Sequence, residues 1–165
     1  PNPEMIFEHK LLYKTKGHVT AEPYRVPIGK AAIRREGTDI TIVGSSIMAL
    51  KAQAAAARLA DEGISAEVID LRSIRPIDFT TIAESVRKTH RLMVVYEGVK
   101  TMGIGAEISA MIAESEVFDF LDAPIVRLGG VDAPIPYNPV LEKAAVPQED
   151  DIFTAALNLL RRGEA

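Results

Sequence analysis

The sequence predicts an α/β protein whose mostly parallel sheet is covered by helices on both faces. Apolar, β-branched stretches alternate with helical patterns along most of the chain, which is typical of this class. Residues 92–96 (LMVVY) are apolar without interruption, as in a strand buried on both faces. The apolar content of 47% in 165 residues is ample for a packed core. The length fits a single domain, which we place at residues 1–165.

The first third of the chain is expected to hold two strands separated by a loop. Residues 5–8 are apolar and precede a charged turn, so they predict a strand. Residues 14–25 are polar and contain Gly and Pro, which indicates a surface loop. Residues 38–43 (TDITIV) are β-branched and end at Gly44, as a buried strand does.

A helix is expected to follow and to run to about Glu62, with Gly63 after its end. Ser45 or Ser46 can cap its start, which is a simpler role for these serines than nucleophilic catalysis. The pattern predicts that the helix packs on the sheet through its alanine-rich face, formed by Ile47, Leu50, Ala54 and Ala57.

Strands and helices then alternate to the end of the chain. Strands are predicted at 66–71, 92–96 and 124–128, and a proline-rich turn at 133–139. Asp78 can cap the first intervening helix, which buries Phe79, Ile82 and Val86 and ends near Lys88 and His90. The second carries Ile104, Ile108, Met111 and Ile112. The last helix has charges that match its dipole, with Glu149, Asp150 and Asp151 at its start, Arg161 and Arg162 at its end, and Gly163 beyond.

The most informative stretch is residues 68–78 (VIDLRSIRPID), where a strand runs into Arg72, Arg75 and a proline. Open α/β sheets place ligand contacts at the carboxyl ends of their strands. The two arginines therefore suggest a docking or ligand edge, while salt bridges that pin the loop are the simpler alternative. Glu97 ends the strand at 92–96 and could act as a general acid/base, although an ion pair with one of these arginines is favoured.

Other candidate sites are weaker. Gly103 and Gly105 lack the rest of a dinucleotide fingerprint, so close helix packing explains them better. His18 lies in a polar loop, His90 ends a helix, and only His9 follows a predicted strand at a place where an interface could form. No His/carboxylate motif has ligand spacing, which argues against a metal site.

Several short segments together resemble the C-terminal domain of thiamine-diphosphate enzymes of the transketolase type, most of all the E1 β subunit of 2-oxoacid dehydrogenase complexes. They are 7–13 (FEHKLLY), 26–31 (VPIGKA) with 35–37 (REG), 68–78, 96–98 (YEG) with 103–108 (GIGAEI), and 121–124 (LDAP) with 134–137 (PIPY). Within that family, 100–101 and 134–136 lean towards pyruvate-type or acetoin-type subunits. The resemblance implies a three-layer α/β/α sandwich of five strands, one of them antiparallel.

The resemblance also implies how the work is divided in the parent enzyme. Thiamine diphosphate and magnesium would be held by a preceding domain and by the α subunit, so we expect no catalytic, cofactor or metal residue here. This domain would organise the subunit, meet a second β subunit and present a surface to the E2 acyltransferase. The interface and edge-loop candidates are then Arg72, Arg75, Glu97, His9, Pro134, Pro136 and Tyr137.

Two alternatives stay open: the C-terminal domain of another transketolase-like enzyme, and a free-standing assembly module without catalysis. A net charge of −4 argues against nucleic acid and anionic membrane surfaces as partners. No apolar run approaches the roughly 20 residues of a membrane helix, and nothing at the start resembles a signal peptide. The absence of cysteine excludes disulfides. We therefore expect a cytoplasmic protein. Its first residues, Pro-Asn-Pro, are consistent with a fragment of a longer subunit.

Overall fold

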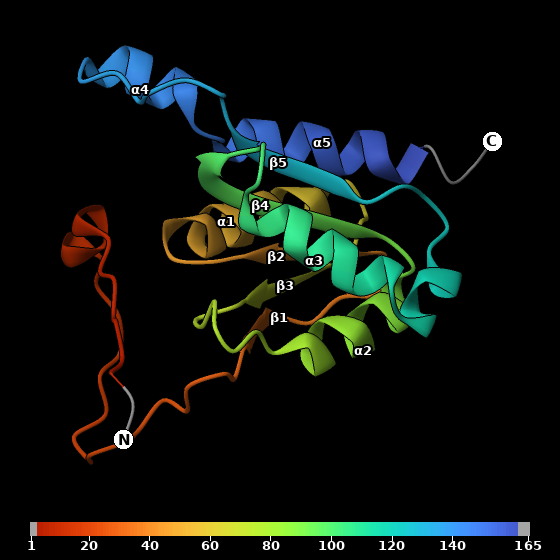
Figure 1. Ribbon diagram of the computed structural model, residues 1–165, viewed down its shortest axis with the longest axis horizontal. Coiled ribbons are helices and arrows are strands. Elements are labelled where there is room, and N and C mark those ends of the chain that lie inside the picture. The colour runs from red at the N-terminus through yellow and green to blue at the C-terminus, as the bar shows by residue number, and fades with distance from the viewer. Residues whose placement is uncertain (1–2, 162–165) are drawn as a thin grey trace.

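The computed structural model describes residues 3–161 and contains a five-stranded sheet with helices on both faces (Figure 1). The strands are β1 (Ala32–Arg35), β2 (Ile40–Gly44), β3 (Ala66–Asp70), β4 (Leu92–Val99) and β5 (Val126–Gly130). Their order across the sheet is β1-β3-β2-β4-β5. Only β1 is antiparallel to its neighbour; the other three pairings are parallel. The three-layer mixed sheet is therefore confirmed.

Each face of the sheet has its own apolar core. Ile42, Val68 and Met93 pack under α1 (Ile47–Asp61) and α5 (Glu149–Arg161). On the other face, Val43 and Val94 pack under α2 (Phe79–Thr89) and α3 (Ile104–Ala113). Consecutive residues of one strand enter opposite cores because side chains alternate along a strand. Residues 92–96 are all buried, so the predicted two-sided burial of this strand is confirmed.

The predicted strand at Met5–Glu8 is wrong. These residues are exposed and have no strand partner; the short 3-10 helix η1 (Lys10–Lys14) follows them. The antiparallel edge strand is β1 instead, a segment for which no strand was predicted. A short apolar run alone does not make a strand, because backbone groups also need a neighbour to pair with.

Of the packing face predicted for α1, Ile47 does pack against the core, but Leu50 and Ala57 do not belong to the buried side. Leu50 is 41% exposed and Ala57 is exposed, whereas the buried side is made of Met48, Ala49, Ala52, Ala55, Ala56 and Leu59. Alanines occur on all sides of this helix, so its sequence hardly distinguishes the buried face from the exposed face. Ser46 does occupy the N-cap position, but neither it nor Ser45 makes a side-chain cap, contrary to the prediction. Gly63 follows the helix at φ 77°, as expected of a residue after a helix end.

The remaining elements differ from expectation mainly at their bounds. The last strand is shifted by two residues relative to the predicted 124–128. The proline-rich turn leads directly into a further helix that was not predicted, α4 (Pro139–Ala145), which is capped by Asn138. Ile82 and Val86 are buried as predicted, with Phe79 packed beside them. Arg162 and Gly163, expected at the end of the last helix, lie outside the described residues.

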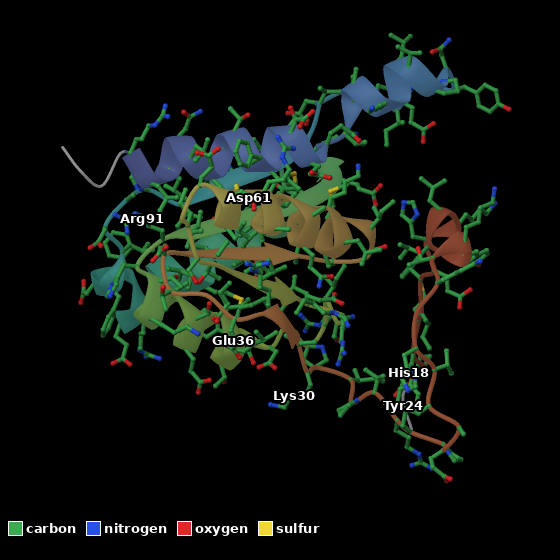
Figure 2. All side chains as sticks on the ribbon, turned by 180° about the vertical axis from the view of Figure 1, so that it is seen from behind. His18, Tyr24, Lys30, Glu36, Asp61 and Arg91 are labelled. Atoms are coloured by element: carbon green, nitrogen blue, oxygen red, sulfur yellow. The ribbon has the colours of Figure 1, made fainter. Side chains whose placement is uncertain are left out.

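Two projecting segments extend from one end of this sandwich (Figure 1). The N-terminal arm, residues 3–28, runs beside the body and includes η1. The C-terminal arm, residues 131–148, carries α4 away from the sheet. Figure 2 shows His18 and Tyr24 on the N-terminal arm, well away from the body. None of the helices described between residues 3 and 161 has the length and apolarity needed to cross a membrane.

Candidate functional site: a crevice at the carboxyl edge of the sheet

The chain reverses its winding between β2 and β4. From β2 it passes through α1, on one face, to β3; from β4 it passes through α3, on the other face, to β5 on the opposite side of the sheet. The loops that leave these two adjacent strands therefore diverge and open a crevice at their carboxyl ends. This is the place where open α/β sheets bind ligands.

A cleft of about 640 Å³ lies at this position. Its floor holds Ile47 and Lys51 from α1 and Glu97 from β4. The N-terminal arm forms one wall, and the C-terminal arm forms the other. The wall residues are Glu8, His9, Lys10 and Leu11 on one side, and Ile135, Pro139, Glu142, Lys143, Val146 and Gln148 on the other.

One hydrogen bond joins the first wall to the floor. His9 Nε2 lies 3.0 Å from Glu97 Oε1, and His9 Nδ1 accepts the Leu11 N–H at 3.2 Å. Because a neutral imidazole has one donor and one acceptor nitrogen, Nε2 carries the proton and donates to Glu97. Among the described residues, this is the one hydrogen bond between positions 3–28 and the rest of the molecule.

Lys51 fastens the second wall. Its Nζ donates to the Pro147 carbonyl at 2.8 Å and to Gln148 Oε1 at 3.1 Å. Burial lowers the pKa of Lys51 below its ordinary value, and the negative charge of Glu97 opposes part of that change. Glu97 thus hydrogen bonds to one wall and acts electrostatically on the lysine that holds the other.

The ion pair predicted between Glu97 and Arg72 or Arg75 is not formed. Both arginines are exposed, and within residues 3–161 neither guanidinium has a hydrogen bond or an ion pair. Glu97 binds His9 instead. The reason is topological: β2 lies between β3, which leads to the arginines, and β4, which carries Glu97.

The other predicted site residues fall in separate places. Pro134, Pro136 and Tyr137 belong to the C-terminal arm, whose tip projects beyond the body (Figure 1). Tyr137 is fully exposed, and Ile135 beside it is 56% exposed. His90 is the C-cap of α2 and its Nδ1 donates to the Phe120 carbonyl at 2.8 Å. Lys51 was missed as a site residue because it lies outside the alanine-rich face that was predicted to pack on the sheet.

The glycines that resembled a nucleotide motif have a packing role, as the simpler interpretation predicted. Gly103 and Gly105 begin α3, and Gly129 lies in β5. A Cβ atom at any of the three would press on the ring of Tyr96, which is 4% exposed at the end of the sheet core. The glycines let the helix and the strand close around this ring.

The crevice does not have the features of a diphosphate–magnesium site. Its three lysines are matched by three glutamates, and no cluster of three His, Cys, Asp or Glu suited to a metal occurs within residues 3–161. Magnesium sites need several oxygen ligands around one point.

The comparisons with known proteins agree on one family. Residues 29–152 match "Transketolase, C-terminal domain". The chain is 49% identical, over 99% of its length, to "Pyruvate dehydrogenase E1 component subunit beta, mitochondrial" of Dictyostelium discoideum, and 51% identical over 94% of its length to the subunit beta-2 of Oryza sativa. It spans 47% and 42% of those relatives. A solved structure, "Split gene transketolase, inactive beta4 tetramer", is similar to this chain with a TM-score of 0.74 and 28% sequence identity. The match covers 89% of this chain and 46% of the transketolase chain.

Proposed function

Because this chain belongs to the transketolase C-terminal domain family, we propose that it is the C-terminal domain of a pyruvate dehydrogenase E1 β subunit. The observation that carries the proposal is the identity of about half of all residues across nearly the whole chain with subunits of that name. The chain spans less than half of those relatives, so the activity belongs to a longer protein. We further propose that residues 1–165 fold as one domain of that subunit.

The proposed role is structural and docking. The parent enzyme would use thiamine diphosphate and magnesium to decarboxylate a 2-oxo acid and would pass the acyl group to a lipoyl group of E2. The lining of the crevice is unlike a magnesium–diphosphate site, and the proposal assigns the catalytic groups to other parts of the enzyme. This domain would hold the crevice and the two arms in position for the rest of the E1 assembly.

The arms support this role because they expose apolar side chains that a free surface rarely leaves uncovered. Phe7 is 84% exposed on the N-terminal arm and Tyr137 is fully exposed on the other. The proposed partners are a second β subunit, the α subunit and E2. Size-exclusion chromatography with light scattering should show self-association of the chain, or a pull-down should show that it binds E2. Tyr137→Glu should abolish whichever association is observed. Phe118→Glu, on a different surface, is the control and should leave it intact. A monomer that binds no E2 would count against the docking role.

A calorimetric titration tests the division of labour. Thiamine diphosphate with magnesium should give no saturable heat with this chain, but should bind tightly to the full-length β subunit mixed with α. Tight binding by the 165-residue chain itself would overturn the proposal.

A second candidate parent is a two-chain transketolase, which the structural match to a split-gene transketolase favours. The lower identity of 28% makes it the weaker candidate. Substrate turnover by the complete enzyme separates them: pyruvate-dependent acylation of E2 supports the first, and ketol transfer between sugar phosphates supports the second. If acetoin is the substrate of the complete enzyme, E2 should be acylated in an acetoin-dependent reaction.

The proposed location of the protein is the cytoplasm, whereas the Dictyostelium relative is named as mitochondrial. Cell fractionation distinguishes the two locations.

A further inference from the structure

The loop between β3 and α2 presents two arginines that are unpaired within the described part of the chain. Arg72 and Arg75 are both exposed, and neither side chain makes a hydrogen bond or ion pair with any residue between 3 and 161. Three other arginines bind carboxylates: Arg34 binds Asp70, Arg58 binds Glu149 and Asp150, and Arg87 binds Glu116. Arg72 and Arg75 differ from these three arginines, and they stand three positions apart in one loop.

The carboxylates that flank the loop are already engaged. Asp70, 7% exposed, accepts two hydrogen bonds from Arg34 and one from the backbone N–H of Arg72. Asp78, 6% exposed, accepts the N–H of Ala31 and caps α2. Turning either carboxylate towards the loop would break these bonds. The positive charge of the loop is thus left for something outside the described chain.

The loop is held in one shape before any partner arrives. Arg72 has a φ of 54°, which is uncommon outside glycine, and its N–H is fixed by Asp70 Oδ1 at 3.2 Å. At the other end, Gly29 lies against the loop so closely that a Cβ atom there would be 2.7 Å from Pro76 Cγ. A prearranged loop loses little conformational entropy when it binds.

Apolar surface and a third cation lie beside the arginines. Ile74 is 56% exposed between them. Lys30 follows Gly29 and is close enough to lower the pKa of Asp78; Figure 2 shows it at the edge of the body where the chain departs towards the arm. On a chain with net charge −4, this cationic edge is a local exception that can steer an acidic partner.

From this arrangement we propose that residues 72–76 form a recognition surface for a segment of a partner protein that carries carboxylates beside apolar side chains. Guanidinium groups bind carboxylates in a bidentate geometry. Ile74 supplies an apolar contact that a phosphodiester backbone would not use. The negative net charge also opposes binding of a nucleic acid. The proposal holds whichever transketolase-like enzyme the chain belongs to.

The test is a ¹⁵N NMR titration of the 165-residue chain with a synthetic peptide of alternating Glu and Leu. The peptide should shift the Nε–H signals of Arg72 and Arg75 in a saturable manner. The double variant Arg72→Gln/Arg75→Gln should weaken the affinity about tenfold, since it removes two charged hydrogen-bond donors. Arg72→Lys/Arg75→Lys keeps the charge but not the bidentate geometry, so its affinity should lie between those of the wild type and the Gln variant.

The matched control is Arg58→Gln/Arg87→Gln, which removes the same charge from arginines that already have carboxylate partners. It should change the affinity less than about twofold. The alternating Gln and Leu peptide should not bind. An absence of shifts in the loop, an equal loss in both double variants, or tighter binding of inorganic phosphate or an oligothymidylate at the loop would overturn the proposal.

Discussion

Glu67 shows how a single charged residue is accommodated inside this fold. Its side chain is 1% exposed, and its carboxylate binds Lys88 and the N–H of Gly37. Burial raises the pKa of Glu67, but hydrogen bonds, that of Lys88 foremost, lower it by more, so the folded-state pKa lies below the ordinary 4.5. The same bond raises the pKa of Lys88 above 10.5. The pair is therefore charged at neutral pH.

Lys88→Met should destabilise the protein by about 3 kcal/mol, because it leaves the buried carboxylate without its cation. Chemical denaturation at pH 7 measures this. Arg87→Met, which removes a cation from the neighbouring exposed ion pair with Glu116, should cost less than about 1 kcal/mol. Equal effects of the two substitutions would contradict the burial argument.

The pH dependence gives a second test of the same pair. A carboxyl group whose folded-state pKa is depressed contributes stability above its unfolded-state pKa and loses it as the pH falls through the folded value. The difference in unfolding free energy between wild type and Lys88→Met should therefore be constant near pH 7 and shrink below about pH 4.5. A difference that grows on acidification would refute the assignment.

At the scale of elements, α2 is anchored through its first turn. Asp78 accepts the Thr81 N–H as the N-cap of α2, and also the Ala31 N–H at 3.0 Å, which ties the segment before β1 to this helix. Burial raises the pKa of Asp78, but these hydrogen bonds lower it below 3.8 overall. One carboxylate thus joins an edge strand to the helix layer.

Asp78→Ala should reduce the unfolding free energy by about 2 kcal/mol at pH 7, because it removes the cap and leaves the Ala31 N–H unpaired. Asp78→Asn can still cap the helix and should cost less. The wild-type advantage over both variants should fall as the pH drops below about 3.8, since protonation removes the charge that accepts these bonds. Thermal unfolding between pH 3 and 7 would reveal a pH-independent difference if this is wrong.

The glycines around Tyr96 set how closely α3 and β5 approach β4. Gly105→Ala should destabilise by about 2 kcal/mol even though alanine favours helices, because the new methyl group would overlap the buried ring. Gly98→Ala is the control, since its Cβ would lie 3.9 Å from the nearest ring atom. In a Tyr96→Leu background the penalty of Gly105→Ala should become smaller. A penalty unchanged by Tyr96→Leu would show that the ring is not the obstacle.

At the scale of the whole molecule, the two arms are fastened to the sheet edge in different ways. The N-terminal arm depends on the bond between His9 and Glu97, while the C-terminal arm is held by Lys51 and by continuity with α5. The N-terminal arm should therefore be the easier of the two to release.

His9→Ala should increase the rate of tryptic cleavage after Lys14 and Lys16 several-fold while leaving the melting temperature of the sandwich unchanged. The reason is that local opening governs proteolysis when few contacts hold a segment. His18→Ala, on the same arm but away from the body (Figure 2), should leave the cleavage rate unaltered. Equal cleavage rates for wild type and His9→Ala would mean that this bond does not restrain the arm.

The buried interior of the sheet should tolerate substitutions far less well than the arms do. Val94 is 1% exposed in the central part of the sheet, and Val94→Asp should prevent folding because no partner is available for a charge there. Circular dichroism and expression in soluble form measure this. Cooperative unfolding of soluble Val94→Asp would contradict the two-sided burial of β4.

The sequence alone determined the alternation of strands and helices, the two-sided burial of residues 92–96 and the caps at Asp78 and Gly63. These features follow from local patterns: hydrophobic period, chain-breaking residues and side chains that bond their own backbone. The order of the family motifs along the chain likewise identified the family, because such a comparison of motifs needs no spatial information.

The tertiary structure alone decided which segment pairs at the sheet edge, which face of α1 is buried and which partner Glu97 takes. The sequence pattern predicted a strand at residues 5–8 and none at 32–35, yet the edge of β3 pairs with the second segment. The alanines of α1 leave its faces nearly equal, so the surrounding core selects one. Glu97 meets His9 rather than an arginine because β2 separates β4 from β3, and strand order is set by long-range packing that no local stretch of sequence encodes.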